Sequence, residues 1–170
     1  MSYIVYLLFH EHKITTTNIS IKNCGVYDCE KNIEDAIEIL RKAPGFKETP
    51  LGFKIVKFIL NKTRWLDGFT SLIGDSTIPE DDSLKIEDKP LKELCLKEVF
   101  LLTHFFEIEQ INGIHDECRY IGVYSNEEET MININKLSKM LGFKDYKNAF
   151  GDASVRLNEI EWLCGYATTD

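Results

Sequence analysis

The sequence has no excess of basic residues and no apolar run long enough to cross a membrane. Its 170 residues include 20 Lys and Arg against 28 Asp and Glu, which gives a formal net charge of −8. Proteins that bind nucleic acids neutralise phosphates with an excess of Lys and Arg, so we expect no nucleic-acid partner. The apolar run from Tyr3 to Phe9 is too short for a membrane span or a signal peptide, so we expect no membrane partner either.

Paired cysteines are also missing. The odd number of cysteines and their irregular spacing match neither a disulfide framework nor a zinc site, because no CxxC pair occurs. Unpaired thiols without an export signal predict a cytoplasmic protein. The five cysteines are Cys24, Cys29, Cys95, Cys118 and Cys164.

The sequence carries no motif that assembles a catalytic centre. It has no G-x-S-x-G elbow, no P-loop and no Rossmann glycine run, so we expect no enzyme and no cofactor. His10-x-His12 places two imidazoles along one side of a strand, but no third ligand accompanies them. We therefore interpret this pair as a coincidence of the surface and expect no metal site.

The two halves of the chain resemble each other. When the sequence is displaced by 97 positions, residues 24–69 lie over residues 121–166 without a gap, and sixteen of these 46 positions are identical. Unrelated sequences of average composition would share about one position in sixteen. We therefore predict two repeats, at residues 1–72 and 98–170, joined by a connector at residues 73–97.

Each repeat has the pattern of two strands, a helix and a third strand. Tyr3 to His10 and Val99 to Phe106 are apolar runs of the kind found in strands that are covered on both faces. The return strands end at Tyr27 and Tyr124, and Asn112-Gly113 favours a hairpin turn in the second repeat. The predicted fold class is α+β, a tandem duplication of a ββαβ unit with antiparallel sheets and one helix per repeat.

Both helices are predicted from their first residues and their apolar spacing. Asp28 and Ser125 stand at equivalent positions and are the expected N-caps, and Ser125 forms a capping box with Glu128. In the third strand of the first repeat, Ile55 and Ile59 make both faces apolar, so we expect this strand to be more covered than its counterpart. The residues that share one face of the first helix are Ile33, Ala36, Ile37 and Leu40.

The connector is the most acidic segment of the chain. Pro79 and Pro90 discourage regular structure around it, and Pro90 can open a short helix at Leu91 to Leu96. The simpler interpretation is a solvated linker, and the sharper one is an acidic segment presented to a basic partner. The candidate binding residues are the acids of the connector and one pair in the second repeat: Asp75, Glu80, Asp81, Asp82, Glu87, Asp88, Asp116 and Glu117.

Several short motifs resemble a small bacterial domain family of unassigned function. The resemblance covers nearly all of the first repeat, whereas the second repeat departs from it at Leu141, Ala149 and Tyr166. The motifs are Val5-Tyr6-Leu7-Leu8-x-His10, Gly25-Val26-Tyr27, Pro44-Gly45-Phe46, Gly52-Phe53 and Trp65-x-x-Gly68-Phe69.

In its size, its acidity, its duplicated small fold and its lack of a catalytic motif, the chain also resembles immunity proteins of bacterial contact-dependent growth inhibition. Such proteins bind a cognate toxin domain, commonly a nuclease, inside the producing cell. The resemblance implies an antitoxin that covers the active site of a basic toxin domain, and an EndoU-type ribonuclease is one candidate. It implies no particular binding residues.

Two other hypotheses remain open. Duplicated domains often form a groove along their pseudo-two-fold axis, so the chain can instead be a regulatory or adaptor module that binds a small ligand or peptide between its repeats. Such a module would be stabilised by its ligand without a protein partner. An unrecognised hydrolase is the third hypothesis, and it would need His10 or His104 for turnover.

Overall fold

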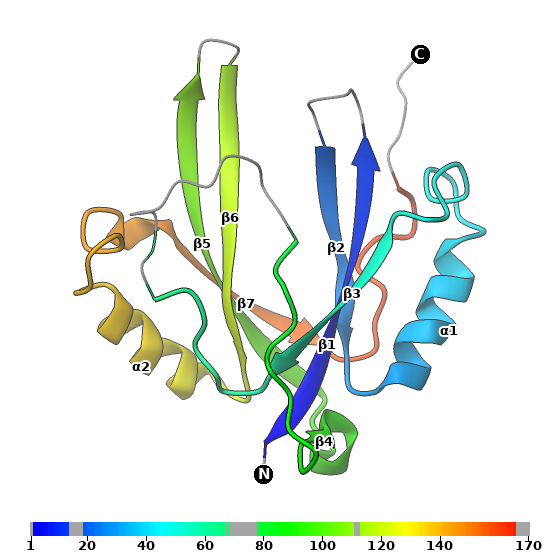
Figure 1. The fold of residues 1–170 in the computed structure, drawn as a ribbon, viewed down its shortest axis with the longest axis horizontal. Helices are drawn as coiled ribbons and strands as arrows, with labels where there is room; N and C mark the ends of the chain where they lie inside the picture. Colours follow the sequence, from blue (N-terminus) through cyan, green and yellow to red (C-terminus); the bar gives the residue numbers. More distant parts are fainter. Residues whose placement is uncertain (1, 14–18, 67, 69–77, 111–112, 166–170) are drawn as a thin grey trace.

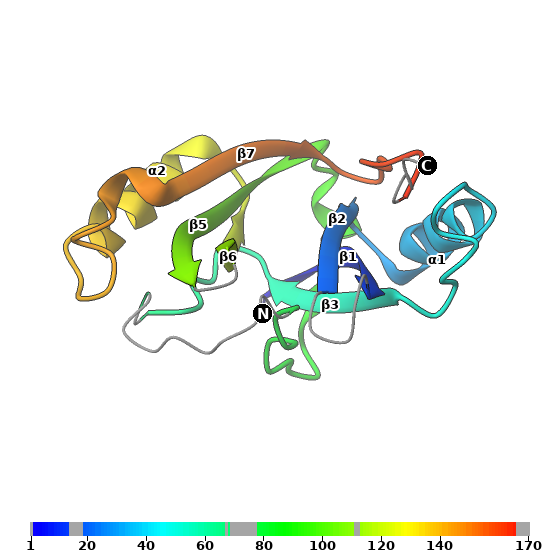
Figure 2. The same cartoon turned by 90° about the horizontal axis from the view of Figure 1, so that it is seen from above.

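The computed structural model describes residues 2–13, 19–66, 68, 78–110 and 113–165. The chain forms four layers, in which two sheets lie between two helices (Figures 1 and 2). The first sheet has the order β2-β1-β3, with β4 parallel to β1, and the second has the order β6-β5-β7. The strands are β1 (Tyr3–Lys13), β2 (Ile19–Tyr27), β3 (Phe53–Ile59), β4 (Lys89–Pro90), β5 (Glu98–Gln110), β6 (Gly113–Tyr124) and β7 (Phe150–Arg156).

The helices occupy equivalent places in the two halves. Helix α1 (Glu30–Leu40) follows β2, and helix α2 (Glu127–Leu137) follows β6. Short 3₁₀ helices precede β5 at η1 (Leu91–Leu94) and β7 at η2 (Lys147–Ala149). The structure therefore confirms an α+β fold with two antiparallel sheets and two helices, and the order of elements is consistent with two similar units.

The largest hydrophobic core lies between the two sheets. Side chains alternate between the faces of a strand, so every second residue of β1 and β5 points toward the other sheet. Val5, Leu7 and Phe9 of β1 pack there with Val99 and Leu101 of β5. Because the other face of each sheet is covered by a helix, β1 and β5 are buried on both sides, as their apolar runs predict.

Each helix closes a smaller core on the outer face of its own sheet. The buried residues of α1 are Ile33, Ala36, Ile37 and Leu40, which confirms the face predicted from their spacing. Helix α2 buries Thr130 and Leu137 over the second sheet. None of the helices in the described part of the chain has the length and apolar character that a membrane span requires.

The predicted helix caps are wrong by one residue. The N-caps are Cys29 and Asn126, and the Asn126 Oδ1 accepts a hydrogen bond from the Glu129 backbone N–H at 2.9 Å. The capping box expected at Ser125 is therefore replaced by the amide of the next residue, because Asn126 already satisfies a free N–H of the first turn.

The third strand of the first half is more covered than its counterpart β7, as expected, although its outer face is not covered throughout. Ile55 is exposed, although Val56 and Phe58 point inward and are buried. Helix α1 packs over β1 and β2, and β3 stands beyond it at the edge of the sheet. An apolar residue on the outer face of β3 therefore lacks a cover.

Each half sends the chain beyond its third strand onto the other half. After β3, the backbone N–H groups of Asn61 and Arg64 donate to carbonyls of β6 at 2.8 and 2.7 Å. After β7, those of Asn158 and Glu161 donate to carbonyls of β2 at 2.8 and 3.3 Å. We call residues 61–65 and 158–162 the exchanged tails, because each extends the sheet of the opposite half.

The two tryptophans mark the ends of these exchanged tails. The guanidinium of Arg119, on β6, lies 4.1 Å from the ring centre of Trp65. The Nζ of Lys22, on β2, lies 3.9 Å from the ring centre of Trp162. Both contacts are cation–π pairs between a tail and the strand it joins, and they occupy equivalent positions in the two halves.

Candidate interaction surface

The connector packs against the outer edge of β3. The backbone N–H of Lys57 donates to the Asp81 carboxylate at 2.7 Å, and the Lys57 carbonyl accepts from the Asp82 N–H at 2.8 Å. The N–H of Ile59 donates to Asp82 Oδ2 at 2.8 Å. A strand edge presents unpaired backbone groups, and the connector satisfies them with carboxylates as well as with its own backbone.

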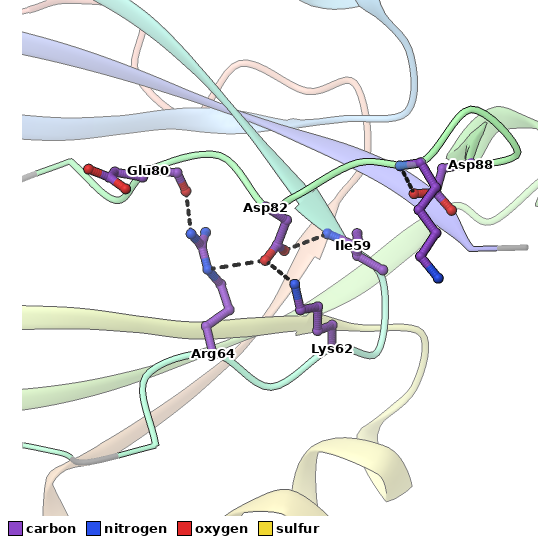
Figure 3. Close-up of polar contacts among 7 residues, drawn as sticks. Ile59, Lys62, Arg64, Glu80, Asp82 and Asp88 are labelled. Atoms are coloured by element: carbon purple, nitrogen blue, oxygen red, sulfur yellow. Dashed lines mark hydrogen bonds and ion pairs between the residues drawn. The ribbon is translucent and has the colours of Figure 1, made fainter.

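Asp82 is the centre of a buried ionic network (Figure 3). Its side chain is only 5% exposed and lies 2.7 Å from the Nζ of Lys62 and 3.7 Å from the Nε of Arg64. Arg64 also donates to the carbonyl of Glu80. A buried carboxylate is stable only when cations and N–H donors surround it, and Asp82 has both.

The candidate acids of the connector therefore separate into two groups. Asp81, Asp82 and Asp88 bind groups of the chain itself, whereas Glu80 and Glu87 have exposed side chains. Asp88 accepts hydrogen bonds from the backbone N–H groups of residues 85 and 2, at 2.8 and 3.1 Å, and these bonds hold the pKa of Asp88 below its ordinary value.

Of the three remaining candidate acids, the structure describes the side chain of one. Glu117 is buried on β6, where its carboxylate accepts from the Arg119 guanidinium at 3.0 Å. Asp75 lies outside the described residues, and so does the side chain of Asp116. The segment expected either as a solvated linker or as a free acidic projection is thus partly a structural strap, because the edge of β3 needs acceptors.

His10 and His104 occupy equivalent buried positions. The Nε2 of His10 is 2.9 Å from the Thr49 carbonyl, and that of His104 is 3.0 Å from the Tyr146 carbonyl. Burial lowers the pKa of both imidazoles, although the backbone hydrogen bond acts in the opposite direction. No group of three or more metal-ligating side chains occurs in the part of the chain that the structure describes.

The negative charge is unevenly distributed along the chain. Residues 1–72 contain eight acidic and ten basic side chains, residues 73–97 contain seven and four, and residues 98–170 contain thirteen and six. The first half is therefore slightly positive, and the connector and the second half carry the whole negative excess. A basic partner would be attracted to the second half.

The outer faces of the two helices differ at two adjacent positions, and there the apolar pair belongs to α2. On α2, Met131 is 43% exposed and Ile132 is 54% exposed, and the exposed Glu128 lies one turn before Ile132. At the positions of α1 that correspond by the 97-residue displacement, Glu34 and Asp35 are exposed. We call Glu128, Met131 and Ile132 the α2 patch.

The α2 patch was not among the residues selected from the sequence. The connector was selected for its charge alone. The α2 patch can be found only by aligning the two halves, because Met131 and Ile132 then correspond to the acidic Glu34 and Asp35. Isolated exposed apolar residues are common on protein surfaces, but a pair beside acidic side chains fits the composition of an interface core and its rim. Comparisons with protein-family models, with curated proteins and with solved structures gave no match to this chain.

Proposed function

We propose that the chain is an immunity protein that binds a basic toxin domain, a nuclease such as an EndoU-type ribonuclease, and covers its active site. The observation that carries this proposal is the α2 patch. Binding energy in protein interfaces comes mainly from a few buried apolar or aromatic side chains, while charged residues at the rim speed association and select the partner. Met131 and Ile132 supply the apolar anchors, and the negative charge of the second half supplies the long-range attraction for a basic partner.

The chain acts in this proposal as a non-enzymatic cytoplasmic inhibitor. A nuclease binds phosphates through basic residues, so its active-site cleft attracts an acidic protein surface. Glu80 and Glu87 of the connector are exposed and remain candidates for the rim of the contact. Asp82 and Glu117 support the surrounding structure instead, because each is buried against a cation of its own chain.

We also propose that the fold arose by tandem duplication. The exchanged tails support this origin, because matched residues make matched contacts in both directions. The Asn61 side chain accepts from the Ser125 N–H at 2.8 Å, and the Asn158 side chain accepts from the Asp28 N–H at 3.2 Å. Both pairs are related by the same displacement of 97 residues.

The test replaces the α2 patch with the corresponding residues of α1. Met131→Glu with Ile132→Asp removes the apolar anchors and leaves the helix foldable, because α1 carries acids at both positions. The wild type and the double variant are assayed for binding, by calorimetry, to the C-terminal domains of the proteins encoded by neighbouring reading frames. Growth rescue by coexpression is measured with the same domains. We expect binding to weaken by at least about 100-fold, as for the loss of two anchor residues.

Two controls separate the anchors from charge. Met131→Gln with Ile132→Asn removes the apolar surface without adding charge and should weaken binding to a similar extent. Glu34→Gln with Asp35→Asn places the same two amide side chains at the corresponding positions of α1 and should leave binding intact. If no neighbouring toxin domain binds the wild-type chain, or if the α2 double variant binds as tightly as the wild type, the proposal is wrong.

The adaptor hypothesis has less support. The space between the two sheets is filled by the shared core in the part of the chain that the structure describes, with Phe9 packed against Tyr120 at 5.0 Å between ring centres. A small ligand between the repeats would have to displace these side chains. Thermal stabilisation of the isolated chain by small metabolites would favour this alternative over the immunity proposal.

A further inference from the structure

Three of the four sheet edges are bonded over part of their length to another segment in the described part of the chain. Residues 158–161 bond to Cys24 and Val26 of β2, residues 61–64 bond to Ile121 and Val123 of β6, and the connector bonds to β3. The outer edge of β7 has no described segment against it. Figure 2 shows β7 along one rim of the molecule and the connector along the opposite rim, below β3.

The uncovered backbone groups on β7 belong to alternate residues. The N–H of Leu157 donates to the Lys97 carbonyl at 2.9 Å and so points toward β5. Backbone groups alternate in direction along a strand, so those of Asp152, Ser154 and Arg156 point away from β5. All three residues are exposed.

In the first half of the molecule, the corresponding outward backbone groups of β3 are hydrogen-bonded. Phe100 stands opposite Ser154 in the same register in which Tyr6 stands opposite Lys57. The Lys57 N–H and carbonyl are both bonded to the connector, at 2.7 and 2.8 Å. Natural proteins cover or blunt a free strand edge with charged side chains, proline or a bulge. β7 has no proline and no bulge, and its two charged residues, Asp152 and Arg156, are of opposite sign.

The outward residues of β7 are complementary to themselves. When two β7 strands are placed antiparallel about a two-fold axis at Ser154, each Asp152 stands opposite Arg156 of the other copy. The two Ser154 residues then exchange backbone hydrogen bonds, and roughly six such bonds form in all. Arg156 is available for this contact, because its present ion pair with Glu159 is 3.5 Å long and its side chain is 74% exposed.

We propose that the β7 edge is a homodimerisation surface, at which two copies of the chain pair β7 with β7 and form one continuous six-stranded sheet. The occupant is a second copy because opposite charges meet twice in this register, whereas a parallel or shifted pairing loses that match. The net charge of −8 on each copy opposes close approach, so the dimer is weak and reversible, as for other interfaces of small area.

The experiment is analytical ultracentrifugation of the full chain in 150 mM salt, at concentrations from about 5 to 500 μM. The expected result is a weight-average mass that rises from 19.7 kDa toward twice that value. Ser154→Pro removes the central N–H that points away from β5, and proline is tolerated at such a position of an edge strand. This variant should keep its circular dichroism spectrum and remain monomeric throughout.

A charge swap tests the register itself. Asp152→Arg places like charges opposite each other and should weaken dimerisation by at least about tenfold. Adding Arg156→Asp restores opposite charges and should recover the dimer. A wild-type chain that stays monomeric, or a dimer that neither Ser154→Pro nor Asp152→Arg weakens, overturns the proposal. Helix α2 packs over β5 and β6, so Met131→Glu with Ile132→Asp leaves the β7 edge unchanged and should dimerise normally. This separates the two proposals.

Discussion

His10 and His104 show how a polar residue is accommodated in an aromatic core. The ring of His10 lies edge-on to Phe46 and Phe53, with centres 4.9 and 4.6 Å apart, and that of His104 has the same relation to its own neighbours. Each Nε2 lies within hydrogen-bond distance of a carbonyl in the loop before the third strand, which favours the neutral tautomer with the proton on Nε2. The histidines therefore tie that loop to the first strand.

The same burial predicts a loss of stability in mild acid. The folded pKa of both histidines is lowered, so the unfolded chain binds more protons wherever the pH lies between the folded pKa and the unfolded value of about 6.5. The free energy of unfolding should then fall as the pH drops from 7.5 to 5. The fall should be about 1.4 kcal/mol per histidine for each unit between its two pKa values.

The double variant His10→Gln with His104→Gln isolates this effect. Glutamine can keep an N–H donor for each carbonyl but does not titrate, so the variant should be less stable at neutral pH and show a flatter pH profile. Urea unfolding at several pH values measures both quantities. An equal slope between pH 7 and 5 in the wild type and the variant would contradict the prediction.

At the scale of elements, the exchanged tails explain several of the positions that match between the halves. A Cβ at Gly25 would lie 2.5 Å from the Glu159 carbonyl oxygen, and one at Gly122 would lie 2.7 Å from that of Lys62. These glycines let each tail approach the edge strand of the other half. Several of the identities between the two halves thus come from contacts between the halves rather than within them.

Asn61 and Asn158 begin the tails in the left-handed backbone region, with φ of 60° and 65°. Replacing either residue with alanine removes its side-chain hydrogen bond to the other half and adds the left-handed strain, so it should cost about 2 kcal/mol. Replacing it with glycine removes only the hydrogen bond and should cost about 1 kcal/mol. Urea unfolding of the four single variants gives the order.

Glycine is the less disruptive substitution in this prediction at both sites, which reverses the usual preference for alanine outside turns. Alanine variants as stable as the glycine variants would show that the backbone relaxes out of the left-handed region and that the tails are held in another way.

At the scale of the whole molecule, the elements could be predicted from the sequence but their assembly could not. Local periodicity was enough for the long strands and both α-helices but not for β4 or η2, and the apolar runs in β1 and β5 indicated cover on both faces. Which layer supplies that cover depends on distant pairs such as Phe9 and Tyr120, and no local pattern encodes such pairs. The burial of Asp82 was missed for the same reason, because composition does not reveal that the edge of β3 needs acceptors.

The candidate site was predicted less well than the fold. Acidic residues were selected by sequence density, yet exposure depends on tertiary contacts, and Glu117 and Asp82 proved to be buried. The α2 patch became visible only when the outer faces of the two helices were compared. The sequence alone pairs Met131 with Glu34 when the two halves are aligned. Comparing the residue types at the polar-face positions of the two helices, rather than counting identities, would have found this difference.

The shared core and the exchanged tails predict that the two halves unfold together. Trp65 belongs to the first half but packs on the second, and Trp162 does the reverse, so each tryptophan reports on contact between the halves. In Trp65→Phe and in Trp162→Phe, the urea midpoint from the fluorescence of the remaining tryptophan should coincide with that from far-UV circular dichroism.

Adding Phe9→Ala to either variant opens a cavity between the sheets and should lower both midpoints by the equivalent of about 3–5 kcal/mol. Glu34→Gln on the exposed face of α1 serves as the control and should move neither midpoint. Two separate transitions, or a shift from Phe9→Ala in one signal only, would mean that the halves are independent domains joined by a strap.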